Sequence, residues 1–267
     1  MIDCKAYAAE ILDGIKAKGH LAVISVGDDP ASMSYIRGKK IDCERVGHKF
    51  THHAYPADVR EEIVLTMIDM LNDNPDVTGI IVQLPLPAHL NAERICDRIA
   101  PEKDVDGFRH DSPYRPCTPE GVVHILRKEL GDLTGKHAVI IGRGKLVGKP
   151  LQQMLLDEDM TVTVCHSKTK KNDRNVLVMW ADAVIVAVGK PRAIDLCCAR
   201  SHCVVIDCGV NRDADGKLCG DVGVCNSPRV TPVPGGVGLM TRAMLMRHVA
   251  EGARMYGGAE NAEKDES

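Results

Sequence analysis

A glycine-rich segment that opens at Gly142 has the composition of a phosphate-binding turn. Gly142, Arg143 and Gly144 are followed by Gly148, in the spacing G-x-G-x-x-x-G, directly after an apolar run. Glycines let the backbone approach a pyrophosphate, and the amides and dipole at the start of a helix stabilise its charge. The spacing is one residue longer than the usual dinucleotide fingerprint, so an ordinary turn is the alternative. The strand expected before the glycines and the helix expected after them favour a dinucleotide site.

The end of the next expected strand bears on which nicotinamide cofactor binds. A carboxylate about 20 residues after the glycines would accept hydrogen bonds from the ribose of NAD. Segment 164–171 carries no acid, but it contains Ser167 and three lysines. Hydroxyl and ammonium groups suit the 2′-phosphate of NADP. A solvated basic loop would have the same composition, and the pattern favours NADP over NAD.

A tyrosine and a lysine four residues apart form a second candidate site. Tyr35 and Lys39 share one face of a helix expected over 32–46, with Ser32 as its cap, after a turn at 27–30. Burial disfavours an ammonium and lowers its pKa, which can make lysine a general base near neutral pH. Alone, the pair fits an exposed helix equally well.

Two further polar residues lie where ligands of α/β proteins gather. Gln83 ends the apolar run 79–82, at the carboxyl end of an expected strand. Asp106 follows a helix expected over 91–99 and precedes Gly107. Each has a local alternative, because Gln83 could bond nearby backbone and Asp106 could form an Asx turn.

The elements that would position these residues alternate between helices and strands, which predicts an α/β fold with parallel sheets covered on both faces. Helices are expected over 4–18, 32–46, 59–71, 91–99 and 239–256, and strands over 21–26, 49–55, 79–82, 137–141, 162–164, 183–187 and 203–207.

Two α/β domains account for this order, with a boundary near 116–121. We expect a first domain over 1–120, onto which the helix 239–256 packs back, and a Rossmann-like second domain over 121–238. The polar segment 257–267 is expected to be disordered.

The composition excludes several classes of partner. The 267 residues carry 34 basic and 37 acidic side chains, a formal charge of -3, which gives no field to attract nucleic acid. No apolar run approaches the ~20 residues of a membrane span. The 11 cysteines are an odd number within ordinary apolar segments, which is typical of reduced thiols in the cytoplasm.

A cysteine-rich stretch raises the alternative of a zinc-binding or redox-sensing module. Six cysteines lie between 197 and 225, but none has C-x-x-C spacing. Cys203 and Cys208 fall within or just after an apolar strand, where cysteine behaves as a small hydrophobic residue. We therefore expect no metal site.

Several strings occur in a fixed order and are long enough to be specific. They are VGDDPAS at 26–32, Tyr35 with Lys39, VQLPLP at 82–87, KDVDGF at 103–108, PCTP at 116–119 and TPVPGGVG at 231–238. In these strings the chain resembles the FolD family, the bifunctional methylenetetrahydrofolate dehydrogenases and methenyltetrahydrofolate cyclohydrolases. The resemblance runs from about Asp3 to Ala250.

The resemblance implies an enzyme of one-carbon metabolism and purine biosynthesis with two α/β domains around a cleft. Such an enzyme oxidises 5,10-methylenetetrahydrofolate to 5,10-methenyltetrahydrofolate with NADP and hydrolyses the product to 10-formyltetrahydrofolate. The first domain would hold tetrahydrofolate derivatives and the Rossmann-like domain NADP. A cytoplasmic homodimer is also implied.

The resemblance also assigns roles to individual residues. Lys39 is implied as the catalytic lysine, hydrogen-bonded by Gln83. Tyr35 would stack near the folate ring system and Asp106 would anchor the pterin. Further substrate contacts are implied for Leu84, Pro85, Pro234, Gly235 and Gly236. Cofactor contacts are implied for Gly142, Arg143, Gly144, Gly148, Ser167 and Val210.

Two other enzymes remain as alternatives. A monofunctional, NAD(P)-dependent folate dehydrogenase should lack Lys39 or its partners, because hydride transfer needs mainly orientation whereas hydrolysis needs proton transfer. A dehydrogenase of amino acids or hydroxy acids would explain only the second half of the chain. The presence of Lys39, Gln83 and Asp106 favours the bifunctional enzyme.

Overall fold

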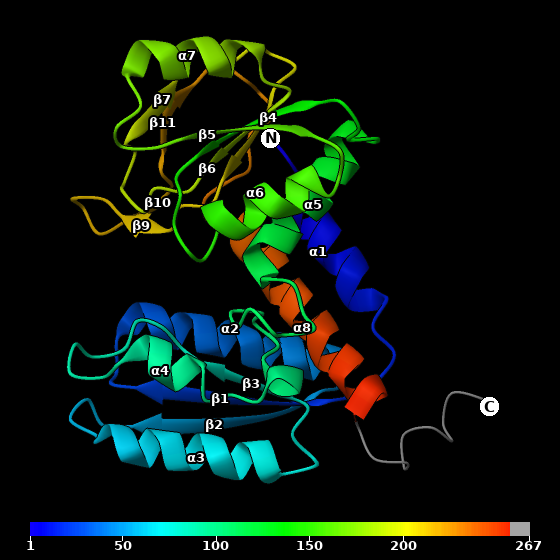
Figure 1. The fold of residues 1–267 in the computed structure, drawn as a ribbon, viewed down its shortest axis with the longest axis vertical. Helices are drawn as coiled ribbons and strands as arrows, with labels where there is room; N and C mark the ends of the chain where they lie inside the picture. The colour runs from blue at the N-terminus through cyan, green and yellow to red at the C-terminus, as the bar shows by residue number, and fades with distance from the viewer. Residues whose placement is uncertain (257–267) are drawn as a thin grey trace. The chain divides into compact units, whose positions relative to one another are not determined.

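The apolar, β-branched runs of the sequence form the central strands of two parallel sheets in the computed structural model, which describes residues 1–256 (Figure 1). Each sheet belongs to its own unit. The Lys39 unit comprises Glu10–Cys117 and the chain from Arg242 onward, and the Gly142 unit comprises Met1–Ala9 and Thr118–Thr241. The predicted α/β class and the parallel second sheet are confirmed. Segment 257–267, for which disorder is expected, lies outside the described residues.

The Lys39 unit contains a three-stranded parallel sheet in the order β2-β1-β3. Its strands are β1 (His20–Val26), β2 (Lys49–Tyr55) and β3 (Gly79–Val82), and its helices are α2 (Pro30–Val46), α3 (Glu61–Asp73), α4 (Ala92–Cys96), the 3₁₀ turn η1 (Pro101–Lys103) and most of α8 (Val237–Tyr256). Every residue of β1 is buried, as the central strand of a covered sheet requires.

The two faces of this sheet are covered by different helices. Ile68 of α3 and Ile95 of α4 pack in one core cluster with Ile24 and Ile80 of the sheet. Figure 1 shows α2 on the side of the sheet opposite to α3. Gln83 directly follows β3, and at this end of the strand it contacts α2.

The start of α2 differs from the expectation that Ser32 is its cap. The cap is Asp29, whose carboxylate accepts a hydrogen bond from the Ser32 backbone N–H at 2.8 Å. Pro30 occupies the first helical position, where its fixed φ and missing N–H cost nothing. The helix ends at Gly47, which has a φ of 78° that suits glycine.

The Gly142 unit contains a four-stranded parallel sheet in the order β5-β4-β6-β8. Its strands are β4 (His137–Ile141), β5 (Thr161–Cys165), β6 (Ala183–Val186) and β8 (Val204–Asp207), and its helices are α1 (Cys4–Asp13, shared with the other unit), α5 (Cys117–Leu130), α6 (Gly148–Leu156) and α7 (Lys171–Trp180). Two small sheets are formed by β7 (Ile194–Leu196) with β11 (Val222–Cys225), and by β9 (Asn211–Arg212) with β10 (Leu218–Cys219).

The strand order places a topological switch point beside β4. The chain passes from β4 to β5 on one side and then to β6 on the other side of β4. Ligands of open α/β sheets bind outside the carboxyl ends of the strands at such a point. The loops after β4 and β6 are therefore where a nucleotide is expected.

The first nine residues pack with the second sheet, although the predicted first domain includes them. The Ile2 backbone N–H donates to the Val230 carbonyl at 3.0 Å, and the Tyr7 hydroxyl donates to the Glu129 carboxylate at 2.8 Å. Both partners belong to the Gly142 unit. These long-range contacts, rather than the helical pattern of the segment, decide where it packs.

The cysteines are free thiols, all eleven of them. Burial raises the pKa of Cys203 to about 12, so this thiol stays protonated. Within residues 1–256 no group of three or more His, Cys, Asp or Glu could hold a metal ion. No helix among these residues is long and apolar enough to cross a membrane.

Candidate catalytic and cofactor sites

Lys39 is a buried lysine whose amine has a neutral hydrogen-bond acceptor defined by the fold. Its Nζ donates to Oε1 of Gln83 at 2.9 Å. The side-chain amide of Gln83 is oriented in turn, because its Nε2 donates to the Leu84 carbonyl at 2.9 Å. The Gln83 backbone N–H donates to the Ile24 carbonyl at 2.8 Å, which extends the pairing of β1 and β3 by one residue. Helix α2 and strand β3 thus bring together two residues 44 positions apart.

The surroundings of Lys39 favour its neutral amine. Burial is the largest cause that lowers the pKa of Lys39, and the positive charge of Arg242 acts in the same direction. The acidic groups of Asp106 and Cys117 act in the opposite direction. A neutral amine that points at a neutral amide can accept a proton from a reacting molecule.

The other folate-site candidates lie around Lys39 in the same unit. Tyr35 is half-buried one helical turn before Lys39, and burial raises the pKa of its hydroxyl, so the group stays protonated. Asp106 is half-buried between η1 and α5, and it lies close enough to Lys39 to raise the pKa of the lysine. Leu84 and Pro85 directly follow Gln83; Leu84 is half-buried and Pro85 is exposed.

Two glycines of the candidate phosphate turn are required by packing. Gly142 has a φ of 128°, and a Cβ at this position would collide with the Ala187 carbonyl oxygen at the end of β6. A Cβ on Gly148, the first residue of α6, would collide with the Gly142 carbonyl. The loops after β4 and β6 therefore pass each other at backbone contact. Such a close turn at a switch point fits a pyrophosphate.

The start of α6 adds to this fit. The cap residue Val147 makes no side-chain hydrogen bond to the first turn of the helix, the Lys149 N–H donates to the Gly144 carbonyl at 3.1 Å, and Pro150 has no N–H. The start of α6 therefore offers a bound anion mainly the positive end of the helix dipole. A Cβ on Gly144 would meet no atom within 4 Å, so this position is open, and Arg143 beside it is exposed. Four of the six residues that the resemblance assigns to the cofactor thus lie in one turn.

Ser167 lies exposed in a turn that follows β5. The His166 backbone N–H donates to the Thr169 hydroxyl at 3.0 Å, and the Thr169 N–H donates to the His166 carbonyl at 2.8 Å. The Lys168 N–H donates to Nδ1 of His166 at 3.2 Å. These bonds hold the turn in one conformation and leave Ser167 at its tip. A hydroxyl and neighbouring ammonium groups at this strand end fit the 2′-phosphate of NADP.

Two buried aspartates fix the loops beyond β6 and β8, and no pattern in the sequence indicated them. The carboxylate of Asp221 accepts hydrogen bonds from the backbone N–H groups of Val188, Gly189 and Lys190 at 2.6 to 2.9 Å. It also accepts one from the Asn211 side chain at 2.8 Å. Asp221 therefore ties together the chain after β6 and the chain after β8.

Asp207 makes the matching set of contacts at the end of β8. Its carboxylate accepts from the backbone N–H groups of Gly209, Asp221 and Val222, each at 2.9 Å. Val210 stands between Gly209 and Asn211, both of which are held by this pair of aspartates, and its side chain is 47% exposed. The cofactor candidate Val210 is thus presented by a fixed loop.

The candidate loop Pro234–Gly236 precedes α8 in the Gly142 unit. Pro234 and Gly235 are exposed, and Gly235 has a φ of 97°. A Cβ on Gly236 would collide with the Pro232 carbonyl. The loop therefore depends on both glycines for its shape.

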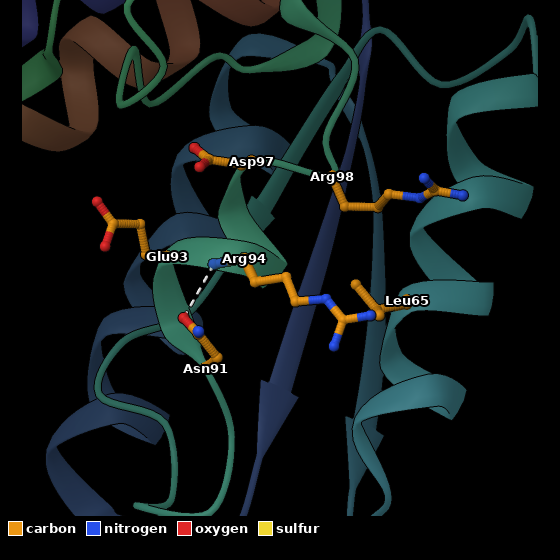
Figure 2. Close-up of a pocket in the computed structure, with 6 residues that line it drawn as sticks. All are labelled: Leu65, Asn91, Glu93, Arg94, Asp97 and Arg98. Atoms are coloured by element: carbon orange, nitrogen blue, oxygen red, sulfur yellow. Dashed lines mark hydrogen bonds between the residues drawn. The ribbon is translucent and has the colours of Figure 1, made fainter.

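A surface pocket of the Lys39 unit lies apart from these candidates. Figure 2 shows that Arg94 of α4 and Arg98, which follows α4, extend toward α3, whereas Glu93 and Asp97 extend away from it. Arg94 pairs with Glu61 at 2.7 Å, and Arg98 pairs with Asp69 of α3 at 2.6 Å. None of the predicted site residues lines this pocket.

Two family models match the chain, one on each side of the expected boundary. The tetrahydrofolate dehydrogenase/cyclohydrolase catalytic domain matches residues 2–106, and the tetrahydrofolate dehydrogenase/cyclohydrolase NAD(P)-binding domain matches residues 116–256.

Similar proteins and solved structures agree with these matches. The bifunctional protein FolD of a Bacillus cereus strain is 47% identical over 250 residues, which cover 89% of this chain and 87% of that protein. The crystal structure of the bifunctional enzyme FolD from Campylobacter jejuni has a TM-score of 0.85 at 38% identity and covers 94% and 97% of the two chains. The Trypanosoma brucei FolD structure, complexed with NADP cofactor and inhibitor, has a TM-score of 0.84 at 29% identity and covers 95% and 97%.

Proposed function

Because this chain belongs to the tetrahydrofolate dehydrogenase/cyclohydrolase family, we propose that Lys39 and the Gly142 turn carry out its two reactions. The enzyme oxidises 5,10-methylenetetrahydrofolate to 5,10-methenyltetrahydrofolate with NADP, and it hydrolyses the methenyl compound to 10-formyltetrahydrofolate. We assign folate binding to the Lys39 unit and NADP binding to the Gly142 unit. The hydrogen bond of 2.9 Å between the buried Lys39 amine and Gln83 is the observation on which the assignment of hydrolysis depends.

The oxidation requires little proton transfer by the protein. The carbon that loses a hydride lies between two nitrogens, whose lone pairs stabilise the resulting cation, so the step needs mainly orientation. NADP supplies the hydride acceptor when it is bound. We assign orientation of the folate to Tyr35, Asp106, Leu84 and Pro85.

The hydrolysis requires proton transfers that Lys39 can perform. As water forms a C–O bond to the methenyl carbon, the neutral Lys39 amine accepts one proton of the water. When the bond from that carbon to N5 breaks, its electron pair remains on N5, which takes the proton back from the Lys39 ammonium. The hydroxyl proton is released to solvent as the formyl C=O forms, so one proton leaves per turnover and Lys39 ends neutral.

The neutral partner Gln83 suits this cycle. A carboxylate in its place would stabilise the ammonium and raise the pKa of Lys39, which opposes proton uptake. The amide oxygen instead fixes the direction of the amine with little preference between its two charge states. Retention of both Lys39 and Gln83 favours the bifunctional enzyme over a monofunctional dehydrogenase.

The cofactor residues supply phosphate binding by the Gly142 turn, beside the positive end of the α6 helix dipole. Gly142 and Gly148 give the close turn, Arg143 and Gly144 are accessible beside it, and Ser167 faces solvent at the strand end expected for the 2′-phosphate. Val210 belongs to the loop held by Asp207 and Asp221.

A cofactor-resolved assay tests the proposal. The purified enzyme is given methylenetetrahydrofolate with NADP or with NAD, and both the reduced nicotinamide and the methenyl compound are followed. We expect NADP to be preferred and the methenyl compound to be hydrolysed faster than its uncatalysed rate. Accumulation of methenyltetrahydrofolate that decays only at the uncatalysed rate would instead identify a monofunctional dehydrogenase.

We also propose that the enzyme is a cytoplasmic homodimer that acts without nucleic acid or a membrane. The formal charge of -3 supports the absence of nucleic acid and the eleven free thiols support the cytoplasm, whereas the homodimer is proposed from the family resemblance. Sedimentation equilibrium measures the oligomeric state directly.

A further inference from the structure

Arg242 lies beside Lys39 and takes no part in the steps assigned so far. It belongs to the Lys39 unit within α8, and its side chain is only 22% exposed. It stands just beyond the string 231–238, so the sequence resemblance gives it no role. Its guanidinium lies against Gly38 and Asp42 of α2.

Gly38 makes room for the guanidinium. It lies inside α2, where glycine is about 1 kcal/mol less favourable than alanine. A Cβ on Gly38 would collide with Nη1 of Arg242 and lie 2.8 Å from its Cζ. The helix therefore carries a destabilising residue at the point where Arg242 rests against its backbone.

Asp42 holds the guanidinium at this place. Its Oδ2 lies 2.8 Å from Nε of Arg242, and its side chain is 10% exposed. The Nε hydrogen is not aligned with an acceptor, so the contact is an ion pair rather than a hydrogen bond. Removing one member of a buried pair leaves an uncompensated charge. Arg242 and Asp42 therefore stabilise each other in this position.

The charge of Arg242 reaches the reactive face of α2. Gly38 and Asp42 follow Tyr35 at three and seven positions, so they share its face, as does Lys39. After burial, which is the largest cause, the positive charge of Arg242 also acts to lower the pKa of Lys39, and it opposes the rise in the pKa of the Tyr35 hydroxyl that burial causes.

The other groups that face Lys39 act in the opposite direction. Asp106 from the loop before α5, Cys117 from α5 and Cys43 from α2 itself each raise its pKa, and Gln83 from β3 contributes a neutral oxygen. Arg242 from α8 is the cation among these groups, and it adds to the effect of burial.

We propose that Arg242, admitted by Gly38 and held by Asp42, is a positioning residue of the hydrolysis that maintains the neutral, proton-accepting form of Lys39. The inference rests on the proposed role of Lys39 as the base. It assigns a function to a glycine, an acid and an arginine that are otherwise unexplained: Gly38 and Asp42 fix the position of the Arg242 guanidinium against the part of α2 that carries Lys39.

The pH profile of the hydrolysis tests this inference. The kcat/KM for methenyltetrahydrofolate is measured against pH, after subtraction of the uncatalysed rate, for the wild-type enzyme, Arg242→Gln and Arg242→Lys. Loss of the positive charge lets the pKa of Lys39 rise, so we expect the acidic limb to move to higher pH in Arg242→Gln. Arg242→Lys keeps the charge and should largely restore the wild-type limb. Arg247→Gln, which removes an ion-paired cation elsewhere on α8, is the control and should leave the limb in place.

A second variant protects the test against a folding defect. Arg242→Gln combined with Asp42→Asn removes both charges, so no buried carboxylate is left without its partner. The double variant should show the same displaced limb. A limb that stays in place in both variants, with folded protein confirmed by circular dichroism, overturns the inference.

Two other results are informative. An equal rise in KM for the folate in both reactions, with the limb in place, would show that Arg242 binds substrate and would overturn the positioning role. Wild-type hydrolysis in Lys39→Met would instead remove the proposed base, and the inference would fall with it. Failure of the proposed base is therefore seen as wild-type hydrolysis in Lys39→Met. Failure of the positioning role alone is seen as an unmoved limb in the Arg242 variants while Lys39→Met loses hydrolysis.

Discussion

A lysine in a protein interior must either find a partner for its charge or lose the charge. Lys39 has a neutral amide as its hydrogen-bond partner, and burial lowers its pKa. Lys103, which is also buried, shows the contrast: its Nζ donates to the carbonyls of Leu71, Asn72 and Asn74 at 2.6 to 3.0 Å. Three backbone acceptors make Lys103 a structural bridge, whereas the side-chain acceptor of Lys39 leaves its amine available for chemistry.

Replacement of Lys39 by Met should separate the two reactions. We expect the hydrolysis rate to fall ~10²–10⁴-fold, as is typical when a proton-transfer group is lost. The oxidation should fall much less, because it depends on orientation, and methenyltetrahydrofolate should accumulate. The measurement is a paired assay of reduced nicotinamide and methenyl compound with the same preparation.

The neighbouring lysine provides the matched control. Lys40 is exposed and lies 4.0 Å from Glu44, so Lys40→Met should leave both rates close to wild type. Equal losses of both activities in Lys39→Met, with folate still bound, would contradict the assignment of Lys39 to hydrolysis alone.

Replacement of Ser167 by Asp should change the choice of cofactor. A carboxylate at this strand end repels the 2′-phosphate of NADP and can accept hydrogen bonds from the ribose of NAD. We therefore expect kcat/KM to fall more for NADP than for NAD. Ser201→Asp, an exposed position just before β8 at the opposite edge of the sheet, is the control. An unchanged NADP-to-NAD ratio in Ser167→Asp would place this residue away from the phosphate.

At the scale of helices and strands, the cofactor loops take their shape from carboxylates rather than from regular pairing. The chain after β6 and the chain after β8 leave the sheet, and their backbone N–H groups lose ladder partners. Asp221 and Asp207 accept these hydrogen bonds from inside. Buried N–H groups must find acceptors, so the two aspartates determine where the loops lie.

Replacement of Asp221 by Asn should therefore weaken cofactor binding more than catalysis of hydrolysis. At the fully buried Asp221 side chain, one acceptor oxygen becomes an NH₂ group that faces backbone donors, so this buried amide and at least one N–H lose their hydrogen bond. We expect KM for NADP to rise by about tenfold or more, the equivalent of about 1–3 kcal/mol for an unsatisfied buried group. Hydrolysis of added methenyltetrahydrofolate should be retained.

The control for this variant is a carboxylate away from the cofactor loops in the same unit. Asp132 accepts a backbone hydrogen bond from Thr134 at 3.0 Å, before β4 begins. Asp132→Asn should leave KM for NADP unchanged. A parallel loss of oxidation and hydrolysis in Asp221→Asn would indicate general destabilisation instead of a loop effect.

The long apolar strands could be predicted, whereas the short elements could not. The runs 79–82 and 137–141 agree with β3 and β4 because each is marked by local hydrophobicity, and the prediction over 49–55 agrees with β2 although that segment is mixed in polarity. Strands β7 and β11 have three and four residues, and each is stabilised by pairing with the other, so no local pattern marks them. The expected first helix ends early, at Asp13, since Gly14 interrupts it.

The site residues that the sequence predicted differ in the same way from those that it did not. Lys39 and Gln83 stand in recognisable strings, and the structure places them in contact. Asp221 and Arg242 act through partners far along the chain, which a single sequence does not reveal. The cap of α2 is an intermediate case, because Asp29 before Pro30 is a local signal that identifies it correctly once Pro30 is taken as the first helical residue.

At the scale of the whole chain, the points of passage between the units fall inside regular structure. The chain passes from one unit to the other after Ala9, after Cys117 and after Thr241, and these points lie within α1, α5 and α8. The point after Cys117 lies in a segment with Pro113, Pro116 and Pro119, and the point after Thr241 closely follows the Pro- and Gly-rich string 231–238. Composition therefore indicates these two points, whereas nothing comparable marks the point after Ala9. Only long-range contacts, such as that of Tyr7 with Glu129, show that the first residues belong with the second sheet.

The stability of the Lys39 unit should depend on the protonation of Asp104. This carboxyl group is 2% exposed, and burial raises its pKa from 3.8 to about 6, against the opposing effect of the hydrogen bond from the Arg109 N–H. Between these two pKa values the folded state binds more protons than the unfolded state. Asp104 therefore stabilises the fold at low pH, and this contribution is lost as the pH rises through about 6.

Other groups that titrate in this range act in the opposite direction. Burial lowers the pKa of His20, His48 and His52, so these residues favour the folded state more as the pH rises. The net pH dependence of the wild-type protein thus combines both signs. A comparison with Asp104→Asn isolates the aspartate, because the histidines are common to both proteins.

We expect the change in unfolding free energy from pH 5 to pH 7 to be more positive in Asp104→Asn than in wild type, by on the order of 1 kcal/mol. Urea unfolding followed by circular dichroism measures it, and fluorescence of Trp180, the single tryptophan, reports separately on the Gly142 unit. Asp111→Asn is the control, because hydrogen bonding to Arg109 lowers the pKa of the exposed Asp111, which puts its titration below pH 5. An identical pH dependence in wild type and Asp104→Asn would show that the Asp104 carboxyl group is already ionised at pH 5 in the folded protein.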